Sequence, residues 1–371
     1  MGKNKNMATP AWASSQKSHI WIFNVGRGLS IFLRTALNQG IMYDFGSSDD
    51  FRPSDFLKKN IIPHLDKYKN SRIAQSVISH PHADHITDIA CLTTPKKENS
   101  PFYSSLHTCP HDKSKGAGSP EAIDWTRIKN PKGSESNIEI YKSLYEGRTL
   151  PLQTICYNSS KSIPNVEYGL YYVRPPVIND IFPDNDQEYG NGMSLVIYYR
   201  HGFHTLLIPG DINPDTFKHL LDEGEGLEKR FTIFDRRQST LHPKWHEKSD
   251  NQPSLKSLLA KHGLSILIAP HHGLESGFSE DLYRAIKDDK PGLVIVSEKR
   301  HLSEIDGKVD SFYQSENGAK GQKVYIDGQK EERYSVSTRN GHHILIQFQG
   351  TSGQPEVYLE KEAEALLKKL K

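Results

Sequence analysis

The chain has 371 residues, of which 35% are hydrophobic and 25% are charged, and its formal net charge is only +2. This near balance of charge excludes strong attraction of the whole surface to polyanions, although a local basic groove stays possible. The length fits one large domain or two ordinary ones.

The sequence pattern predicts neither export nor membrane insertion. The first 20 residues lack the apolar centre of a signal peptide, and no apolar stretch approaches the ~18–20 residues that a membrane span needs. The cysteines, Cys91, Cys109 and Cys156, have neither zinc-finger nor redox spacing, so we interpret them as reduced thiols. We therefore predict a cytoplasmic protein with no membrane partner.

The N-terminal part of the chain alternates short apolar runs with turns. Strands are predicted at 20–33 (two strands around a Gly-x-Gly turn), 40–48 and 72–80. Residues 54–68 have a helical pattern around a proline and are expected on an outer face. The run 72–80 suits a buried strand, and it ends at His80.

Residues 94–165 differ from the rest of the chain. They are rich in Lys, Ser, Pro, Gly and Asn, and only the stretch 138–147 has helical periodicity. We interpret this segment as a long insertion between two sets of strands. Functional loops and disordered segments share such a composition, so its role stays open.

Regular patterns return in the second half. Strands are predicted at 169–176, 193–200, 203–211, 264–270, 292–297 and 342–348, and helices at 214–222, 253–263, 279–289 and 355–371. The second and third of these strands form a hairpin that turns at His201-Gly202. Ser254 is placed to cap the second helix and Gly263 to end it.

The run SHPHADH at 79–85 carries the chemistry. It places His80, His82, Asp84 and His85 directly after an apolar strand, where a short loop can present four metal ligands at once. We predict that the first two histidines bind one ion and that Asp84 and His85 bind a second, at roughly 3.5–4 Å. The alternative is a surface loop rich in histidine, since the chain has 18 histidines, but four ligands within six positions disfavour it.

The H-x-H-x-D-H run resembles the hallmark of the metallo-β-lactamase superfamily. The similarity is greatest to the soluble metallohydrolase domain of bacterial DNA-uptake channel proteins and related stand-alone hydrolases. Further stretches that match this family, in its order, are FNVGRG (23–28), MYDFGS (42–47), NGMSLVI (191–197), LLIPGD (206–211), IAPHHGLESG (268–277) and STRNGHHILI (337–346).

The resemblance implies an α/β fold. We expect an αββα four-layer sandwich of the metallo-β-lactamase type, with two mixed β-sheets, outer helices and the metals at one edge. A single domain would span 1–350, including the insertion at about 94–165 and a loop at 231–250. A C-terminal helix at 351–371 would pack on that domain.

The resemblance also implies roles for residues outside the histidine run. The implied metal ligands are His80, His82, Asp84, His85, Asp211 (bridging both ions) and His272. We favour His272 as the ligand and His271 as the residue that faces the substrate, although adjacent side chains cannot be oriented from sequence. Asp44 would accept a hydrogen bond from a ligand imidazole.

Asn191 stands where many members of the superfamily have a histidine ligand. An amide is a poor zinc ligand but a good donor to a phosphate or a developing oxyanion, and the first metal would keep an open position. The alternative is that Asn191 only closes a turn before the strand. Two departures, Leu29 after Gly28 and the pair Thr87-Asp88, leave the ligands intact but put the substrate in doubt.

A weaker signal lies in the loop 231–250. Its basic and aromatic residues, Arg236, Arg237, Lys244 and Trp245, suit a nucleic-acid strand through phosphate contacts and base stacking. The alternative is a solvated loop unrelated to substrate. A Ser-His-Asp hydrolase has little support, because the chain has no G-x-S-x-G motif.

These observations predict a metal-dependent hydrolase that uses a hydroxide bridging two divalent ions, most simply zinc, with manganese as an option. Asp84, His271 and Asn191 are the predicted catalytic residues, with Asp84 orienting the hydroxide. A phosphodiesterase or nuclease is favoured, with nucleic acid or another phosphodiester as partner. The alternatives are a small-molecule hydrolase (phosphocholine-type ester, lactone or thioester) and a non-catalytic metal-binding regulator.

Overall fold

A computed structural model describes most of the chain. The described residues are 10–36, 38–66, 72–93, 100–102, 106–107, 123–146, 166–173, 175–222, 230–232, 254–298 and 307–370. Among them there is no helix with both the length and the apolar character that crossing a membrane requires. Much of the predicted insertion and nearly all of the loop 231–250, including its Arg, Lys and Trp side chains, lie outside the described residues.

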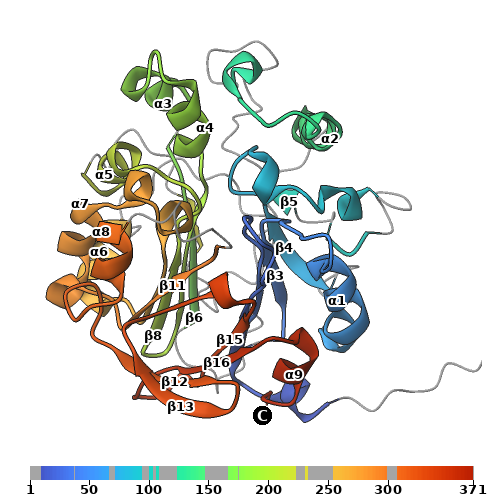
Figure 1. The fold of residues 1–371 in the computed structure, drawn as a ribbon, viewed down its shortest axis with the longest axis vertical. Coiled ribbons are helices and arrows are strands. Elements are labelled where there is room, and N and C mark those ends of the chain that lie inside the picture. Colours follow the sequence, from blue (N-terminus) through green and yellow to red (C-terminus); the bar gives the residue numbers. More distant parts are fainter. Residues whose placement is uncertain are drawn as a thin grey trace, which may run out of the picture.

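Two mixed sheets form the centre of the molecule (Figure 1). The first contains β1 (Ser18–Ile22), β2 (Ile31–Arg34), β3 (Gly40–Tyr43), β4 (Ile73–Val77), β5 (Leu106–His107), β12 (Gln322–Ile326), β13 (Gln329–Arg333), β15 (His343–Phe348) and β16 (Glu356–Glu360). Their order is β13-β12-β16-β15-β1-β2-β3-β4-β5. The second contains β6 (Val166–Tyr171), β7 (Val196–His201), β8 (His204–Ile208), β9 (Arg230–Thr232), β10 (Ile266–Ile268), β11 (Leu293–Val296) and β14 (Ser335–Ser337), in the order β14-β11-β10-β8-β7-β6-β9.

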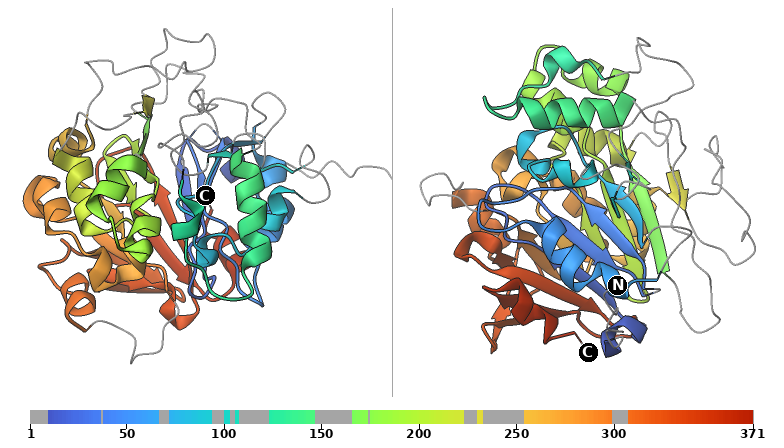
Figure 2. Two further views of the ribbon diagram at one scale, coloured as in Figure 1. Left: turned by 90° about the horizontal axis from the view of Figure 1, so that it is seen from above. Right: turned by 90° about the vertical axis from the view of Figure 1, so that its right-hand side faces the viewer.

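Helices surround the two sheets (Figure 1). They are α1 (Pro53–Asn60), α2 (Glu135–Glu146), α3 (Pro175–Ile181), α4 (Asp186–Gly192), α5 (Pro214–Asp222), α6 (Leu255–His262), α7 (Glu280–Ala285), α8 (Gly307–Tyr313) and α9 (Ala363–Leu367). Helices α5 to α8 lie outside the second sheet, and α1 lies outside the first (Figures 1 and 2). This mixed α/β arrangement is compatible with the expected αββα sandwich.

The central strands, β1 to β4, β7, β8, β10 and β11, are buried on both faces, and their side chains alternate between two hydrophobic cores. In β1, Ile20 and Ile22 join the core between the sheets, while Trp21 joins the core under the helices. In β10, Ile266 and Ile268 face the other sheet in the same way. Successive side chains of a strand point to opposite faces, so a nearly continuous apolar run marks a strand covered on both sides.

Most predicted elements are present, with different bounds. The strand expected at 169–176 is β6, which ends at Tyr171, and Pro175 already belongs to helix α3. The strand pair expected at 20–33 is β1 and β2, and the hairpin expected at His201-Gly202 joins β7 to β8. Ser254 caps α6 by accepting a hydrogen bond from the Ser257 N–H at 3.1 Å, and Gly263 ends the helix with φ 68°.

The C-terminal helix expected at 351–371 is mostly wrong. Residues Glu356–Glu360 form strand β16, which pairs with β15 and β12, and only Ala363–Leu367 are helical. Val357 and Leu359 are buried while their neighbours are partly exposed, which is the period of two expected of a strand. The tail is rich in strong helix formers, and pairing between two strands overrides that propensity.

Candidate metal centre

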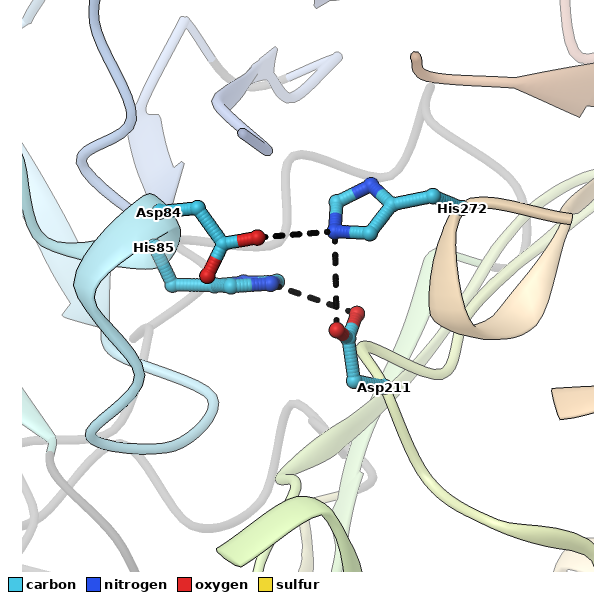
Figure 3. A group of neighbouring side chains, drawn as sticks. All are labelled: Asp84, His85, Asp211 and His272. Carbon is cyan, nitrogen blue, oxygen red and sulfur yellow. Dashed lines mark ion pairs between the residues drawn. The ribbon is translucent and has the colours of Figure 1, made fainter. Parts of the chain in front are cut away.

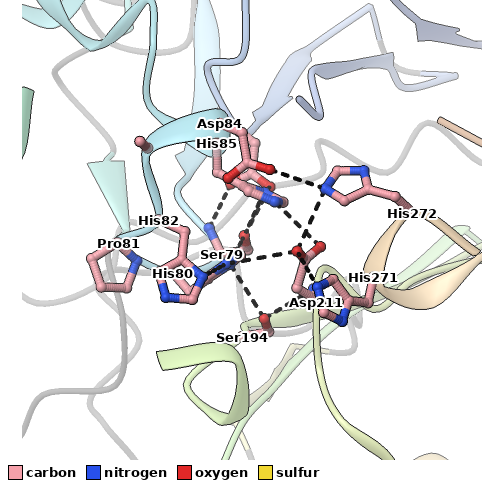
Figure 4. A network of polar contacts seen from close by, with 12 residues as sticks. Ser79, His80, Pro81, His82, Asp84, His85, Ser194, Asp211, His271 and His272 are labelled. Carbon is pink, nitrogen blue, oxygen red and sulfur yellow. Dashed lines mark hydrogen bonds and ion pairs between the residues drawn. The ribbon is translucent and has the colours of Figure 1, made fainter. Parts of the chain in front are cut away.

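The sequence-predicted ligands follow strands that end at one edge of the two sheets. His80 follows β4 in the first sheet, whereas Asp211 follows β8 and His272 follows β10 in the second. Strand β4 runs parallel to β3, and β10 runs parallel to β8. Loops after parallel strands meet at the same edge of a sheet, which brings together residues far apart in the sequence. Figures 3 and 4 show the side chains converging from both sheets.

Four side chains form a compact donor cluster. Asp84, His85, Asp211 and His272 each offer one ligand atom, and these atoms all lie within 4.8 Å of one another (Figure 3). His272 Nε2 lies 3.3 Å from Asp84 Oδ2 and 3.5 Å from Asp211 Oδ2, and His85 Nε2 lies 3.2 Å from Asp211 Oδ1. Donors about 2.0–2.1 Å from a tetrahedral ion are about 3.3 Å apart, so the cluster has the size of a coordination shell.

His80 and His82 form a second donor pair beside this cluster (Figure 4). His80 Nε2 lies 3.1 Å from His82 Nδ1 and 3.9 Å from Asp211 Oδ2. Asp211 Oδ2 therefore lies between the two groups of donors.

Several of these buried atoms have no hydrogen-bond partner in the described part of the chain. They are His82 Nε2, His85 Nε2, His272 Nε2 and Asp211 Oδ1. Leaving a buried polar atom unpaired costs about 1–3 kcal/mol. His85 Nε2, His272 Nε2 and Asp211 Oδ1 also lie in the donor cluster, where ligand atoms are as close together as those around a shared ion. The residues present therefore fit a cation.

Hydrogen bonds on the far side of the rings aim these imidazoles. His85 Nδ1 lies 2.7 Å from Asp44 Oδ2, as predicted for Asp44, and that carboxylate also accepts from the N–H and hydroxyl of Ser79. His272 Nδ1 donates to the Ser297 carbonyl at 2.8 Å. A ring whose Nδ1 is engaged in this way would present Nε2 to a bound metal, so Asp44 and Ser297 set the direction in which the His85 and His272 rings point.

Opposite charges fix the protonation of the cluster. Burial alone would raise the pKa of Asp84 and Asp211, but His85 and His272 hold both below the ordinary carboxyl value. Burial would lower the pKa of the two imidazoles, and the carboxylates overcome this effect, raising the pKa of His272 to about 10 and that of His85 well above its usual value. In the metal-free protein, protonated His85 and His272 neutralise the charges of Asp84 and Asp211. A bound cation would take over this role.

His80, His82 and His271 behave differently. Burial, as the largest cause, lowers the pKa of each imidazole. These rings are therefore neutral near pH 7, and a neutral imidazole is the form that binds a metal or accepts a proton.

Glycines allow backbone to approach the ligands closely. A Cβ at Gly28 would lie 2.2 Å from the Asp84 carbonyl oxygen, and one at Gly46 would lie 3.0 Å from the same atom. A Cβ at Gly190, in α4, would lie 2.5 Å from His82 Nε2. Gly28 of FNVGRG and Gly46 of MYDFGS therefore leave room for the backbone of the histidine run, which a larger residue at either position would displace.

Asn191 and Ser194 lie just before the first residue of β7. Asn191 is the penultimate residue of α4, fully buried, and both atoms of its side-chain amide lack a hydrogen-bond partner among the described residues. Ser194 Oγ accepts from the Asp211 N–H at 3.1 Å and lies 3.4 Å from His80 Nδ1. Ser194 thus links donors from the two sheets.

The adjacent histidines His271 and His272 point differently. Both have positive φ, 47° and 55°. His272 belongs to the four-residue cluster, whereas His271 Nε2 lies 3.8 Å from Asp211 Oδ2 and its Nδ1 lies 2.8 Å from Ser276 Oγ. This geometry agrees with the assignment of His272 as ligand.

Sequence reasoning did not identify Ser79, Ser297, Gly190 or Asn130 as parts of the site. Serine, glycine and asparagine are common in loops, and only their partners distinguish these four. Asn130 accepts from the Ala83 N–H at 2.7 Å, inside the histidine run.

No model of a known protein family matches the chain, and no curated protein sequence matches it either.

Proposed function

We propose that the chain is a metal-dependent hydrolase with an αββα fold of the metallo-β-lactamase type, and that it acts as a phosphodiesterase or nuclease. The observation that carries the proposal is the buried group of donor atoms described above. Asp211 stands between the pair His80–His82 and the group formed by Asp84, His85 and His272. These side chains form ion pairs, yet the buried atoms His82 Nε2, His85 Nε2, His272 Nε2 and Asp211 Oδ1 have no hydrogen bond of good geometry among the described residues, and a bound cation would satisfy the atoms of the cluster.

The residues present divide into two ligand sets. His80 and His82 would hold one divalent ion, Asp84, His85 and His272 the other, and Asp211 both. Zinc suits the imidazoles, and manganese remains an option because carboxylates supply hard oxygen ligands. When bound, such a pair of ions supplies an acidified water molecule and stabilises negative charge that develops on the substrate.

The chain's own residues have separable tasks in hydrolysis. The Asp84 side chain is 34% exposed, whereas Asp211 and His272 are 4% exposed, so Asp84 is the member of the cluster that substrate reaches first. His271 stands beside Asp211 with 14% of its side chain exposed and a neutral ring that can take up or release a proton at Nε2.

Asn191 favours a phosphodiester over other substrates. Its buried amide has two hydrogen-bonding atoms without a partner among the described residues, and an amide N–H can donate to a phosphoryl oxygen. The alternative that it merely closes a turn has less support, because a turn residue would use its side chain within the turn.

The test compares substrates and variants with the full-length protein. Single-stranded DNA, duplex DNA, RNA and bis(p-nitrophenyl) phosphate are each incubated with zinc or manganese, alongside a lactone and a thioester. We expect phosphodiester cleavage that falls about 10³-fold or more in the double variant Asp84→Ala, His85→Ala, because removing ligands forfeits several kcal/mol of charge stabilisation. Asn191→Ala should lose about 10²–10³-fold in kcat.

Asn137→Ala, on the partly exposed face of α2, serves as the control and should retain full activity. Turnover of the lactone or thioester alone would overturn the phosphodiester assignment. Failure of the reconstituted wild type to bind any metal would overturn the whole proposal.

A further inference from the structure

The described segment 123–130, within the insertion at 94–165, contacts both the histidine run and helix α4. We propose that this segment sets the geometry of the metal centre, with Asn130 and Arg127 as positioning residues. The inference rests on the metal site proposed above and assigns a role to part of an insertion whose composition left its role open.

Asn130 holds the backbone on both sides of His82. The Ala83 N–H donates to Asn130 Oδ1 at 2.7 Å, and Asn130 Nδ2 donates to the Pro81 carbonyl at 3.2 Å. These two peptide groups flank the His82 Cα, so a single side-chain amide pairs with the loop as a neighbouring strand would. The pairing fixes His82 in the extended conformation, φ −77° and ψ 147°, immediately before the turn that carries Asp84 and His85.

Arg127 fastens the same segment to the helices beside the site. The residue is 8% exposed. Its guanidinium lies 4.2 Å from the centre of the Tyr189 ring, and it donates to two side chains and a carbonyl: Asp186 Oδ1, Asn179 Oδ1 and the Phe182 oxygen. A rigid guanidinium fork engaged on several partners holds α3 and α4 in one place relative to the segment.

The contacts of Asn130 and Arg127 both act on the position of His82. Helix α4 carries Gly190, whose missing side chain makes room for His82 Nε2, and it also carries Asn191. Through Asn130, the segment fixes the backbone of His82. Through Arg127, it fixes helix α4, whose Gly190 lies against the His82 ring. The 3.1 Å separation of His80 Nε2 and His82 Nδ1 depends on both.

The test measures metal binding rather than turnover. Zinc and, separately, manganese are titrated calorimetrically into metal-free wild type, Asn130→Ala and the matched control Asn137→Ala. Partners that orient ligands typically contribute about 10–100-fold to metal affinity. We expect Asn130→Ala to weaken one of two binding events about 10-fold and to leave the other within about twofold. Asn137→Ala should bind as the wild type does.

Two further variants separate positioning from folding. Asn130→Asp keeps an acceptor for the Ala83 N–H but loses the donor to Pro81, so it should weaken the same event to a smaller degree. Arg127→Lys keeps the charge and loses the fork, and it should also weaken that event. Circular dichroism and the Tm of the metal-free proteins check the fold, and Asn130→Asp carries the test if Asn130→Ala does not fold.

The outcomes distinguish this inference from the proposed function. If the wild type binds two ions and the folded Asn130 variants bind them with unchanged affinity, the positioning role is wrong while the hydrolase proposal stands. If the wild type binds no metal, the hydrolase proposal itself is wrong.

Discussion

At the scale of single residues, a histidine outside the candidate metal centre links stability to pH. His343, the first residue of β15, is 5% exposed. Its Nδ1 lies 3.1 Å from the Asn24 N–H, a donor, so this nitrogen accepts and must be unprotonated. Burial, assisted by the neighbouring His342, lowers the pKa of His343 to about 4. Protonation would both bury a charge and break this hydrogen bond.

The lowered pKa predicts acid sensitivity. An unfolded histidine titrates at about 6.5, so His343 contributes stability that is present above about pH 6.5 and is lost as the pH falls toward 4. Between pH 7 and 5 this one group should remove about 2 kcal/mol from the free energy of unfolding. Urea denaturation of the metal-free protein at both pH values measures the loss, and His343→Gln should lose about 2 kcal/mol less. Equal losses in the two proteins would contradict this origin.

At the scale of elements, the C-terminal strand joins parts of the first sheet. Strand β16 lies between β15 and β12, so the hairpin of β12 and β13 reaches the rest of that sheet through it. Its inward side chains Val357 and Leu359 are buried, as is Leu366 of α9. The tail is therefore part of the core and not an attached helix.

Truncation of a buried side chain in this strand should be costly. Leu359→Ala is expected to lower the free energy of unfolding by about 2–5 kcal/mol, because it leaves a cavity in the core between the sheets. Glu364→Ala, on the exposed side of α9, should change it by no more than about 0.5 kcal/mol. Chemical denaturation compares the two. Similar small effects would mean that the tail is not packed in the sheet.

At the scale of the whole molecule, the candidate site connects the two sheets. Asp84 and His85 follow a strand of the first sheet, whereas Asp211 and His272 follow strands of the second. A metal bound to all four would cross-link the halves of the molecule. Any ligand that binds only the native state stabilises it, by about 2.7 kcal/mol at a hundred times its Kd.

Metal addition should therefore raise the Tm and release protons. For a chain of 371 residues, 2.7 kcal/mol corresponds to about 3–4 °C for each saturated site. Because the pKa of His272 is raised to about 10 in the metal-free protein, binding at pH 7–9 must displace its proton, and affinity should rise as the pH rises toward 10. Thermal unfolding with metal or EDTA, and calorimetry in buffers of different protonation enthalpy, measure both effects. Metal binding without proton release would contradict the protonation assigned to His272.

The sequence alone determined the local features. Apolar runs with β-branched residues predicted β1 to β4 and β10. A strand buried on both faces is apolar at nearly every position, so a few residues are enough to reveal it. The close spacing of His80, His82, Asp84 and His85 predicted a group of ligands, because a single loop carries all four side chains. The cap at Ser254 depends on a contact only three residues away.

Only the tertiary structure decided what depends on contacts between distant residues. Parallel strand ends in two sheets bring Asp211 and His272 to the histidine run, and the partner of Nδ1, not the order in the chain, distinguishes His272 from His271. Asn130 is part of the site because its side chain hydrogen-bonds to the backbone of Pro81 and Ala83. The C-terminal segment is a strand because it pairs with β15 and β12. Propensity and periodicity act over a few residues, whereas packing chooses among the structures that they allow.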